Sequence, residues 1–400
     1  MAIKFHVLVF KIKNNNKGRV ELVTSKAWVL YRDDNVVGLQ EEDFSFPDIV
    51  SNEVLIEPLY GCWESNMTHA INRDPVNIAR IRREAKIILG NAGVVRVEKV
   101  GCDVSNVRAG DVCMFMPGGF LDEYGFIVTV HGYDACNTVG LLAKRTKCRA
   151  EQLMPLPKDS KLTLQQWAGF SLRFMTAWSN WKVALGALRL QLSEEELPSP
   201  IVLGWGGGTT LAELKLAQLM GCNCYMISGS DEHLREIRDM GIKPIDRREF
   251  IEINFDEERF GSDREYRSTY IRSEKTFLNI IKNKTENRGV SIVIDYIGSP
   301  VYRASLRALG RQGVLTTAGW KVGMELTSNR ANECINRHVH VFTHAARRGE
   351  AEPAMQFAEE NDWMPKIESE YGWKDMPQLA ADFDAGLVST YFPVFAINPE

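Results

Sequence analysis

The chain has 400 residues, 44% of them hydrophobic, which is enough for two domains with separate cores. A formal net charge of −4 at pH 7 argues against a nucleic-acid partner, and no apolar run approaches the ~18 residues of a membrane-spanning helix. Lys4, His6 and Lys11 interrupt the first residues, which therefore lack the apolar region of a signal peptide. We expect a cytoplasmic protein without a membrane partner, and its eight cysteines, in no regular framework, suit a reducing compartment.

The first half of the chain is rich in short β-like runs that turn signals separate. These runs span residues 5–12, 27–31, 53–58, 94–100, 112–116 and 126–130. Clusters of Asp, Asn and Gly, such as residues 33–35 and 108–111, are typical of the turns between strands. The sequence therefore predicts an all-β unit at the start of the chain.

Residues 201–221 predict a strand, a glycine loop and a helix. A short apolar run precedes the loop, and apolar side chains at helical spacing follow it. A dinucleotide diphosphate needs such a loop, because Cβ atoms would keep its oxygens from the backbone N–H groups and from the positive end of the helix. Thr210 stands where the usual fingerprint has a glycine, so we expect a slightly displaced loop. The predicted loop residues are Gly204, Gly206, Gly207, Gly208, Thr209 and Thr210.

A second strand at residues 223–227 and a helix at 231–240 complete the βαβ pattern. An NAD-preferring site would place a carboxylate at the tip of this strand, where the chain has Ser228 and Ser230 instead. Small hydroxyl residues leave room for a 2′-phosphate, and basic residues on the next helix would supply donors or charge. These are His233, Arg235 and Arg238, for which a solvated helix face is the competing interpretation. We infer NADPH as the cofactor.

The second half continues in βα fashion, with strands expected at residues 291–297, 313–317 and 338–342. A helix at 350–361 leads to a last strand at 392–397, which suits the first domain better than the second.

Several of these segments together resemble the medium-chain dehydrogenase/reductases over nearly the whole chain. The likeness is carried by residues 52–56 with Gly61, residues 90–101 and 104–112, Thr176-Ala177, the glycine loop, residues 295–298 and residues 310–319. The resemblance implies an α/β protein with a GroES-like β-rich catalytic domain and a Rossmann domain, a doubly wound parallel sheet that binds the nucleotide. It places the catalytic domain at 1–178, completed by 350–400, and the Rossmann domain at 179–349. It adds Gly298 and Gly319 to the cofactor-binding residues and implies a homodimer.

Many members of that family hold a catalytic zinc ion with a cysteine, a histidine and a second cysteine. This sequence has Trp63, Asn91 and Leu172 at those positions, and Ala92 where a glutamate would follow the histidine. None of these side chains ligates zinc, so we expect no metal and a resemblance to the zinc-free reductase branch.

Within that branch, the chain resembles crotonyl-CoA carboxylase/reductases and related enoyl-thioester reductases. Residues 240–247 and the charged insert at 248–275 carry this likeness. His131-Gly132-Tyr133-Asp134 resembles their Trp-Gly-aromatic-Glu stretch, and His344 falls near their active-site histidine. Asp134 is shorter than their glutamate, and Trp63 stands near a position where their carbon dioxide site uses an asparagine. The resemblance therefore implies reduction more strongly than carboxylation.

Reduction of a conjugated thioester requires particular groups in the active site. Hydride from NADPH lands on Cβ, charge collects on the carbonyl oxygen, and the site must donate hydrogen bonds there and deliver a proton or another electrophile to Cα. The candidates are His344, Asp134, Tyr133 and Asn66, with His69 and Asn91 in reserve. Each has a structural alternative: a surface histidine, a turn residue, a core aromatic and a helix cap, respectively.

The sequence thus favours an NADPH-dependent reductase of an acyl thioester carried on CoA or on an acyl carrier protein. Two alternatives stay open. One is a zinc-free quinone or enone reductase that takes free small molecules, and the other is a nucleotide-binding protein without catalysis.

Overall fold

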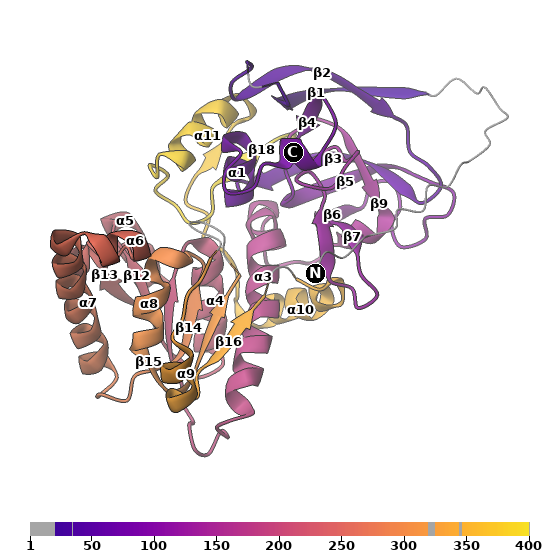
Figure 1. Cartoon of the computed structure of the whole chain (residues 1–400). Helices are drawn as coiled ribbons and strands as arrows, with labels where there is room; N and C mark the ends of the chain where they lie inside the picture. The colour runs from indigo at the N-terminus through magenta and orange to yellow at the C-terminus, as the bar shows by residue number, and fades with distance from the viewer. Residues whose placement is uncertain (1–20, 34, 319–324, 344–345, 400) are drawn as a thin grey trace.

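The computed structural model describes residues 21–33, 35–318, 325–343 and 346–399. It contains two packed units, one rich in β-strands and one in which helices cover a parallel sheet (Figure 1). This arrangement confirms the predicted fold class. The strand expected at 5–12 lies outside the described residues.

The β-rich unit is organised around one antiparallel sheet in the order β10-β6-β5-β3-β18, with β9 also pairing β3. Strand β3 is buried along most of its length, which explains its nearly continuous apolar sequence. The elements are β1 (Leu22–Tyr31), β2 (Leu39–Pro47), β3 (Glu53–Cys62), α1 (Ser65–Asn72), α2 (Ile78–Ile81), β4 (Lys86–Ile88), β5 (Gly93–Val100), β6 (Val112–Phe115), β7 (Gly118–Leu121), β8 (Ile127–Val130), β9 (Thr146–Arg149) and β10 (Leu153–Pro155).

The end of the chain returns to this unit. Its elements are α10 (Ala351–Asn361), β17 (Glu370–Tyr371), α11 (Met376–Asp384) and β18 (Val394–Ala396). Strand β18 pairs with β3, and Phe395 packs where Gly61 has no side chain: a Cβ built on Gly61 would lie 2.6 Å from Cε2 of Phe395. The division predicted at 178/179 falls within the continuous helix α3 (Leu164–Arg189), and the domain bounds stay a prediction.

The second unit holds six described parallel strands in the order β13-β12-β11-β14-β15-β16. The order reverses at β11, which lies between β12 and β14, and this reversal is the switch point where doubly wound sheets bind ligands. The elements are β11 (Ile201–Trp205), α4 (Gly208–Leu219), β12 (Asn223–Ser228), α5 (Asp231–Asp239), β13 (Lys243–Asp246), α6 (Glu257–Ser262), α7 (Arg264–Lys284), β14 (Val290–Asp295), α8 (Ser299–Ala308), β15 (Leu309–Thr317), α9 (Arg330–Asn336) and β16 (Val339–Phe342).

The charged insert folds as α6 and α7 and packs against the sheet. Phe250 of the insert and Phe277, which follows it in α7, reach Trp205 at the end of β11: the Trp205 ring centroid lies 6.3 Å from that of Phe250 and 5.4 Å from that of Phe277. The buried Glu274 carboxylate binds Arg303 and Arg307 of α8 and thereby fixes α7 to α8. The insert is therefore part of the packed unit, and it contacts the sheet at Trp205.

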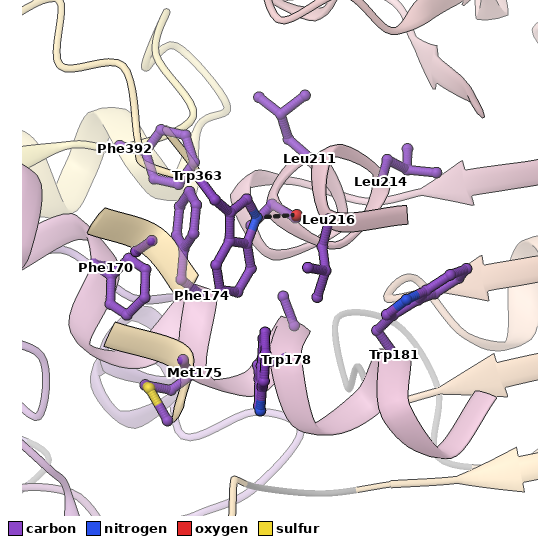
Figure 2. Packing of buried hydrophobic residues seen from close by; sticks show 14 of the residues in the cluster. Phe170, Phe174, Met175, Trp178, Trp181, Leu211, Leu214, Leu216, Trp363 and Phe392 are labelled. Carbon is purple, nitrogen blue, oxygen red and sulfur yellow. Dashed lines mark hydrogen bonds between the residues drawn. The ribbon is translucent and has the colours of Figure 1, made fainter. Parts of the chain in front are cut away.

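Helix α3 runs along both units and joins their cores. Thr163 begins it as an N-cap that accepts a hydrogen bond from the Gln166 N–H, in a capping box. One face of α3 packs against α4, and Trp363 fills the space between the two helices (Figure 2). The Trp363 ring contacts Phe174, with centroids 5.0 Å apart, and its Nε1–H donates to the Ala212 carbonyl at 2.9 Å.

Among the described residues, no helix has the length and apolar character that crossing a bilayer requires.

Replacing Trp363 by Ala should lower the free energy of unfolding by about 3–5 kcal/mol, because the substitution leaves a large cavity between α3 and α4. Urea unfolding followed by circular dichroism measures this change. Leu190→Ala is the control, since Leu190 is 90% exposed and its truncation should cost no more than about 0.5 kcal/mol. Equal midpoints for the two variants would contradict the central place of Trp363 in the core.

Candidate active site

The glycine loop connects β11 to α4 at the switch point of the parallel sheet. Gly206 has a φ of +146°, which L side chains rarely adopt. Gly207 is the N-cap of α4. Among the described residues no side chain caps this helix, so the loop offers its first backbone N–H groups and the positive end of a 12-residue helix.

The four glycines of the loop have different surroundings. A Cβ on Gly204 would meet Leu214 at 2.7 Å, and one on Gly206 would meet Tyr296 Cβ at 2.9 Å, so both keep α4 and β14 close to β11. A Cβ on Gly208 would lie 2.6 Å from the Tyr391 carbonyl oxygen. Gly207 alone of these four is exposed, and no atom of the residues that the structure describes lies within 4 Å of its Cβ position.

This geometry fits a dinucleotide diphosphate in front of Gly207, as the sequence predicts. Thr209 lies partly exposed on the first turn of α4, at the edge of the same space. Thr210 is fully buried, and its hydroxyl donates to the Trp205 carbonyl at 3.1 Å. Its side chain therefore supports the loop from behind and does not reach the open space.

The residues expected at the 2′-phosphate gather at the end of β12, but several are already engaged. Ser230 caps α5 by accepting the His233 N–H, and Ser228 hydrogen-bonds the Tyr391 hydroxyl. The His233 ring stacks on Tyr391 at a centroid distance of 4.2 Å. Arg235 is exposed, with Glu232 3.8 Å away.

The end of β13 adds an arginine that sequence reasoning did not include. Ser228 and Asp246 are partners in the parallel ladder, and a Cβ on Gly229 would lie 3.9 Å from Cβ of Arg247. Arg247 is exposed and has no ion pair among the residues the structure describes, whereas Arg248 is held by Asp246 at 2.6 Å. The feature that could have identified Arg247 is the strand order of a doubly wound sheet, which places the end of β13 beside the end of β12.

The neighbouring strand β14 ends in a buried carboxyl group. Asp295 accepts the backbone N–H groups of Ile297 at 2.8 Å and Gly298 at 3.0 Å. Burial raises the pKa of Asp295 to about 6. Gly298, a predicted cofactor-binding residue, has a φ of +100° and begins α8, while Gly319 lies outside the described residues.

Polar atoms of several side chains in the β-rich unit are buried without a hydrogen-bond partner in the described part of the chain, and three of these side chains belong to the residues singled out from the sequence. They are the Tyr133 hydroxyl, both side-chain atoms of Asn91 and the Asn66 carbonyl oxygen. Tyr133 is 3% exposed, and burial raises its pKa to about 12, so the phenol stays protonated at neutral pH. A Cβ on Gly132 would meet the Gly90 backbone at the C atom, 3.1 Å away, so the Tyr133 and Asn91 segments lie against each other.

Two other catalytic candidates have different surroundings. Asp134 accepts the Val130 N–H at 2.6 Å through Oδ1 and so closes the turn after β8. His344 lies outside the described residues. His131, which precedes the turn, is buried, and its pKa falls to about 4 because burial disfavours its charged form.

The positions that align with zinc ligands are occupied by side chains that pack in the protein interior. Trp63 is fully buried, with its Nε1–H donating to the Thr68 hydroxyl at 3.0 Å, and Leu172 lies partly buried on α3. Among the described residues, no three His, Cys, Asp or Glu side chains are arranged to hold a metal ion.

A buried ion pair lies next to Trp63. Arg173 of α3 donates from Nε to both oxygens of Glu64 at 3.0 Å, and from Nη2 to the Trp63 carbonyl at 2.5 Å. Its Nη1 binds the carbonyl of Tyr391, against which the first residue of α4 packs. Arg173 thereby joins the β-rich unit to the end of the chain beside the glycine loop.

The fold is that of solved reductases and dehydrogenases. The chain aligns with the 2-octenoyl-CoA carboxylase reductase CinF, solved with NADP and 2-octenoyl-CoA, at a TM-score of 0.77 and 18% identity, over 94% of this chain and 88% of that one. A crotonyl-CoA carboxylase/reductase aligns at a TM-score of 0.78 and 19% identity over the same shares. An NAD-dependent alcohol dehydrogenase aligns at a TM-score of 0.72 and 18% identity, over 93% of this chain and 99% of that one.

By sequence, the chain is similar to the highly reducing polyketide synthase lcsB of Purpureocillium lilacinum, with 23% identity over 233 residues. The match covers 58% of this chain but only 7% of that much longer protein. No family model matches the chain.

Gly207→Val should weaken NADPH and NADH binding alike by at least about tenfold, or ~1.4 kcal/mol, because the side chain would fill the space before α4 that both diphosphates need. Calorimetry of both cofactors tests this. The thermal midpoint should stay close to that of the parent, since no atom of the described residues lies within 4 Å of the Cβ position. Gly206→Val is the contrasting variant, which should lower the midpoint because its Cβ collides with Thr210 and Tyr296.

Proposed function

We propose that this chain is an NADPH-dependent reductase that delivers hydride to Cβ of an α,β-unsaturated acyl thioester. The observation that carries the proposal is the open Gly207 at the start of α4, at the sheet switch point of a fold shared with reductases solved with NADP and an acyl-CoA. The thioester would be carried on CoA or on an acyl carrier protein. A homodimer, a cytoplasmic location and independence from zinc are part of the same proposal.

The preference for NADPH rests on the charge at the ends of β12 and β13. No carboxylate follows β12 at the position that would bind a ribose 2′-hydroxyl, and Ser228 and Ser230 stand there. Arg247, whose Cβ lies beside Gly229 and which has no ion pair among the described residues, can donate to a 2′-phosphate from its guanidinium. We expect one such charge-assisted hydrogen bond to favour NADPH over NADH by about tenfold, which is ~1.4 kcal/mol.

Bound NADPH would supply the hydride, and the side chains of the protein would stabilise the resulting negative charge. Tyr133 and Asn91 carry neutral N–H and O–H donors in a buried, water-poor setting, where a hydrogen bond to a developing oxyanion is strongest. We assign the thioester carbonyl to these donors and keep Asn66 as a further candidate at the site. His344 and Asp134 are the proposed groups for protonation at Cα, as the resemblance implies.

An assay of NADPH oxidation at 340 nm over a panel of enoyl-CoA thioesters and free enones tests the proposal. We expect turnover with thioesters and slower turnover with NADH. Activity on free enones alone would favour a quinone or enone reductase, and cofactor binding without turnover on any substrate would favour a nucleotide-binding protein. Adding bicarbonate to the same assay distinguishes protonation from carboxylation at Cα by the mass of the product.

Tyr133→Phe should lower kcat on a good thioester by about tenfold, because one hydrogen bond to the oxyanion is lost, equivalent to ~1.4 kcal/mol. Its stability should stay equal to the parent's or rise slightly, because the variant removes a buried hydroxyl without a partner. Steady-state kinetics and thermal unfolding measure both effects. An unchanged kcat would make Tyr133 a core aromatic only.

A further inference from the structure

A buried polar network lies behind the glycine loop, where α3 and α4 meet the ends of three strands. Glu213 of α4 is fully buried, and both of its carboxyl oxygens accept from Nδ2 of Asn180 on α3 at 2.9 Å. The Tyr296 hydroxyl, just after β14, lies 2.9 Å from Oε2 of Glu213. A carboxyl group at this depth is uncommon unless a cation pairs with it, and no ion pair of Glu213 occurs among the described residues.

The network extends to the strand ends that would face the nicotinamide half of the cofactor. Oδ1 of Asn180 accepts from the Thr316 hydroxyl of β15 at 2.7 Å and also from the Thr343 hydroxyl, directly after β16. Asn180 is therefore fully committed, with its oxygen held by two hydroxyls and its amide directed at Glu213.

Tyr296 connects this network to the cofactor loop. Its Cβ would lie 2.9 Å from a Cβ on Gly206, and its backbone N–H donates to the Trp205 carbonyl at 2.9 Å. A shift of Tyr296 would therefore displace the backbone of Gly206 and Gly207.

Glu213 is uncharged at neutral pH in these surroundings. Burial raises its pKa to about 8, although the hydrogen bonds from Asn180 and Tyr296 oppose the rise. The other titratable group that touches it is Tyr296, whose pKa burial also raises, and the contacts from α3, β15 and β16 come from Asn180, Thr316 and Thr343, which do not titrate. In the neutral form the carboxyl proton of Glu213 can lie on Oε2 and be donated to the Tyr296 oxygen, 2.9 Å away.

We propose that Glu213, in its neutral form, is a positioning residue for the dinucleotide, and that its ionisation at alkaline pH weakens cofactor binding. An ionised carboxylate here has no cation to neutralise it, so α4 and Tyr296 must shift to admit water. It also adds negative charge to the helix whose N-terminus faces the diphosphate. This inference rests on the proposed function, since it concerns the same cofactor.

The direction of the stability effect follows from the raised pKa. Between pH 4.5 and about 8 the folded protein keeps a proton on Glu213 that the unfolded chain releases. The free energy of unfolding therefore falls as pH rises through this window. Above about pH 8 Glu213 is ionised in the folded and in the unfolded protein, and the free energy of unfolding is lowered by the full cost of the buried carboxylate. Glu213→Gln keeps a neutral side chain of the same size and removes this dependence.

The test compares the parent, Glu213→Gln and Glu213→Ala by calorimetry with NADPH at pH values from 6.5 to 9.5. We expect the dissociation constant of the parent to rise about tenfold over this range, and that of Glu213→Gln to change less than threefold and to match the parent at pH 6.5. Glu213→Ala should bind weakly at every pH. Asp295 and Glu236, whose pKa values are raised to about 6 and 7, are present in both the parent and Glu213→Gln, so the difference between the two pH profiles belongs to Glu213.

Parallel pH profiles for the parent and Glu213→Gln would overturn the inference while leaving the proposed function intact. Thermal unfolding without cofactor is the second measurement: the midpoint of the parent should fall more steeply from pH 6 to pH 9 than that of Glu213→Gln. Equal slopes would show that Glu213 is not a neutral buried acid. A parent that fails to bind NADPH at any pH would instead contradict the proposed function, and with it the role of Glu213 in cofactor binding.

Discussion

The placement of the two units depends on one buried charge, the guanidinium of Arg173. It joins the end of β3, the long helix α3 and the end of the chain, through Glu64 and the carbonyls of Trp63 and Tyr391. Removing one partner of such a pair costs about 3–5 kcal/mol, because the other charge is left buried and unpaired. Gly208 packs directly on this junction, so the first turn of α4 is positioned by an ion pair that belongs mainly to the β-rich unit.

Much of the fold followed from sequence periodicity, because parallel strands buried on both faces read as unbroken apolar runs. The strand, loop and helix at 201–219 and the helix at 351–361 lie where they were expected. Helix α3 was not predicted as a helix. Its buried residues include Arg173 and Asn180, polar positions that disturb an apolar stripe and whose partners lie far away in the sequence.

The site was predictable where local chemistry fixes it and not where tertiary contacts do. Four glycines marked the cofactor loop, but only packing shows that Gly207 alone of them faces open space. Ser228 and His233 were expected to be available to a phosphate, yet Tyr391 from the end of the chain contacts both. Arg247 was missed because its proximity to Gly229 comes from strand order, which sequence spacing does not contain. Whether His344, Asp134, Tyr133 and Asn66 act in catalysis stays a prediction.

On the proposed function, the side chains at the zinc-aligned positions change how a carbonyl group can be activated. Trp63 occupies its position as a fully buried ring, so on the proposed function polarisation has to come from neutral dipoles. Tyr133 and Asn91 are buried without partners among the described residues, and each such group costs about 1–3 kcal/mol of folding stability. A carbonyl oxygen that accepted from them would recover this cost on binding and recover more as charge develops on the oxygen, because the donors are already desolvated and fixed. On the proposed function, buried donors without partners such as Tyr133 and Asn91 are therefore the groups that would take over the polarising role of a metal.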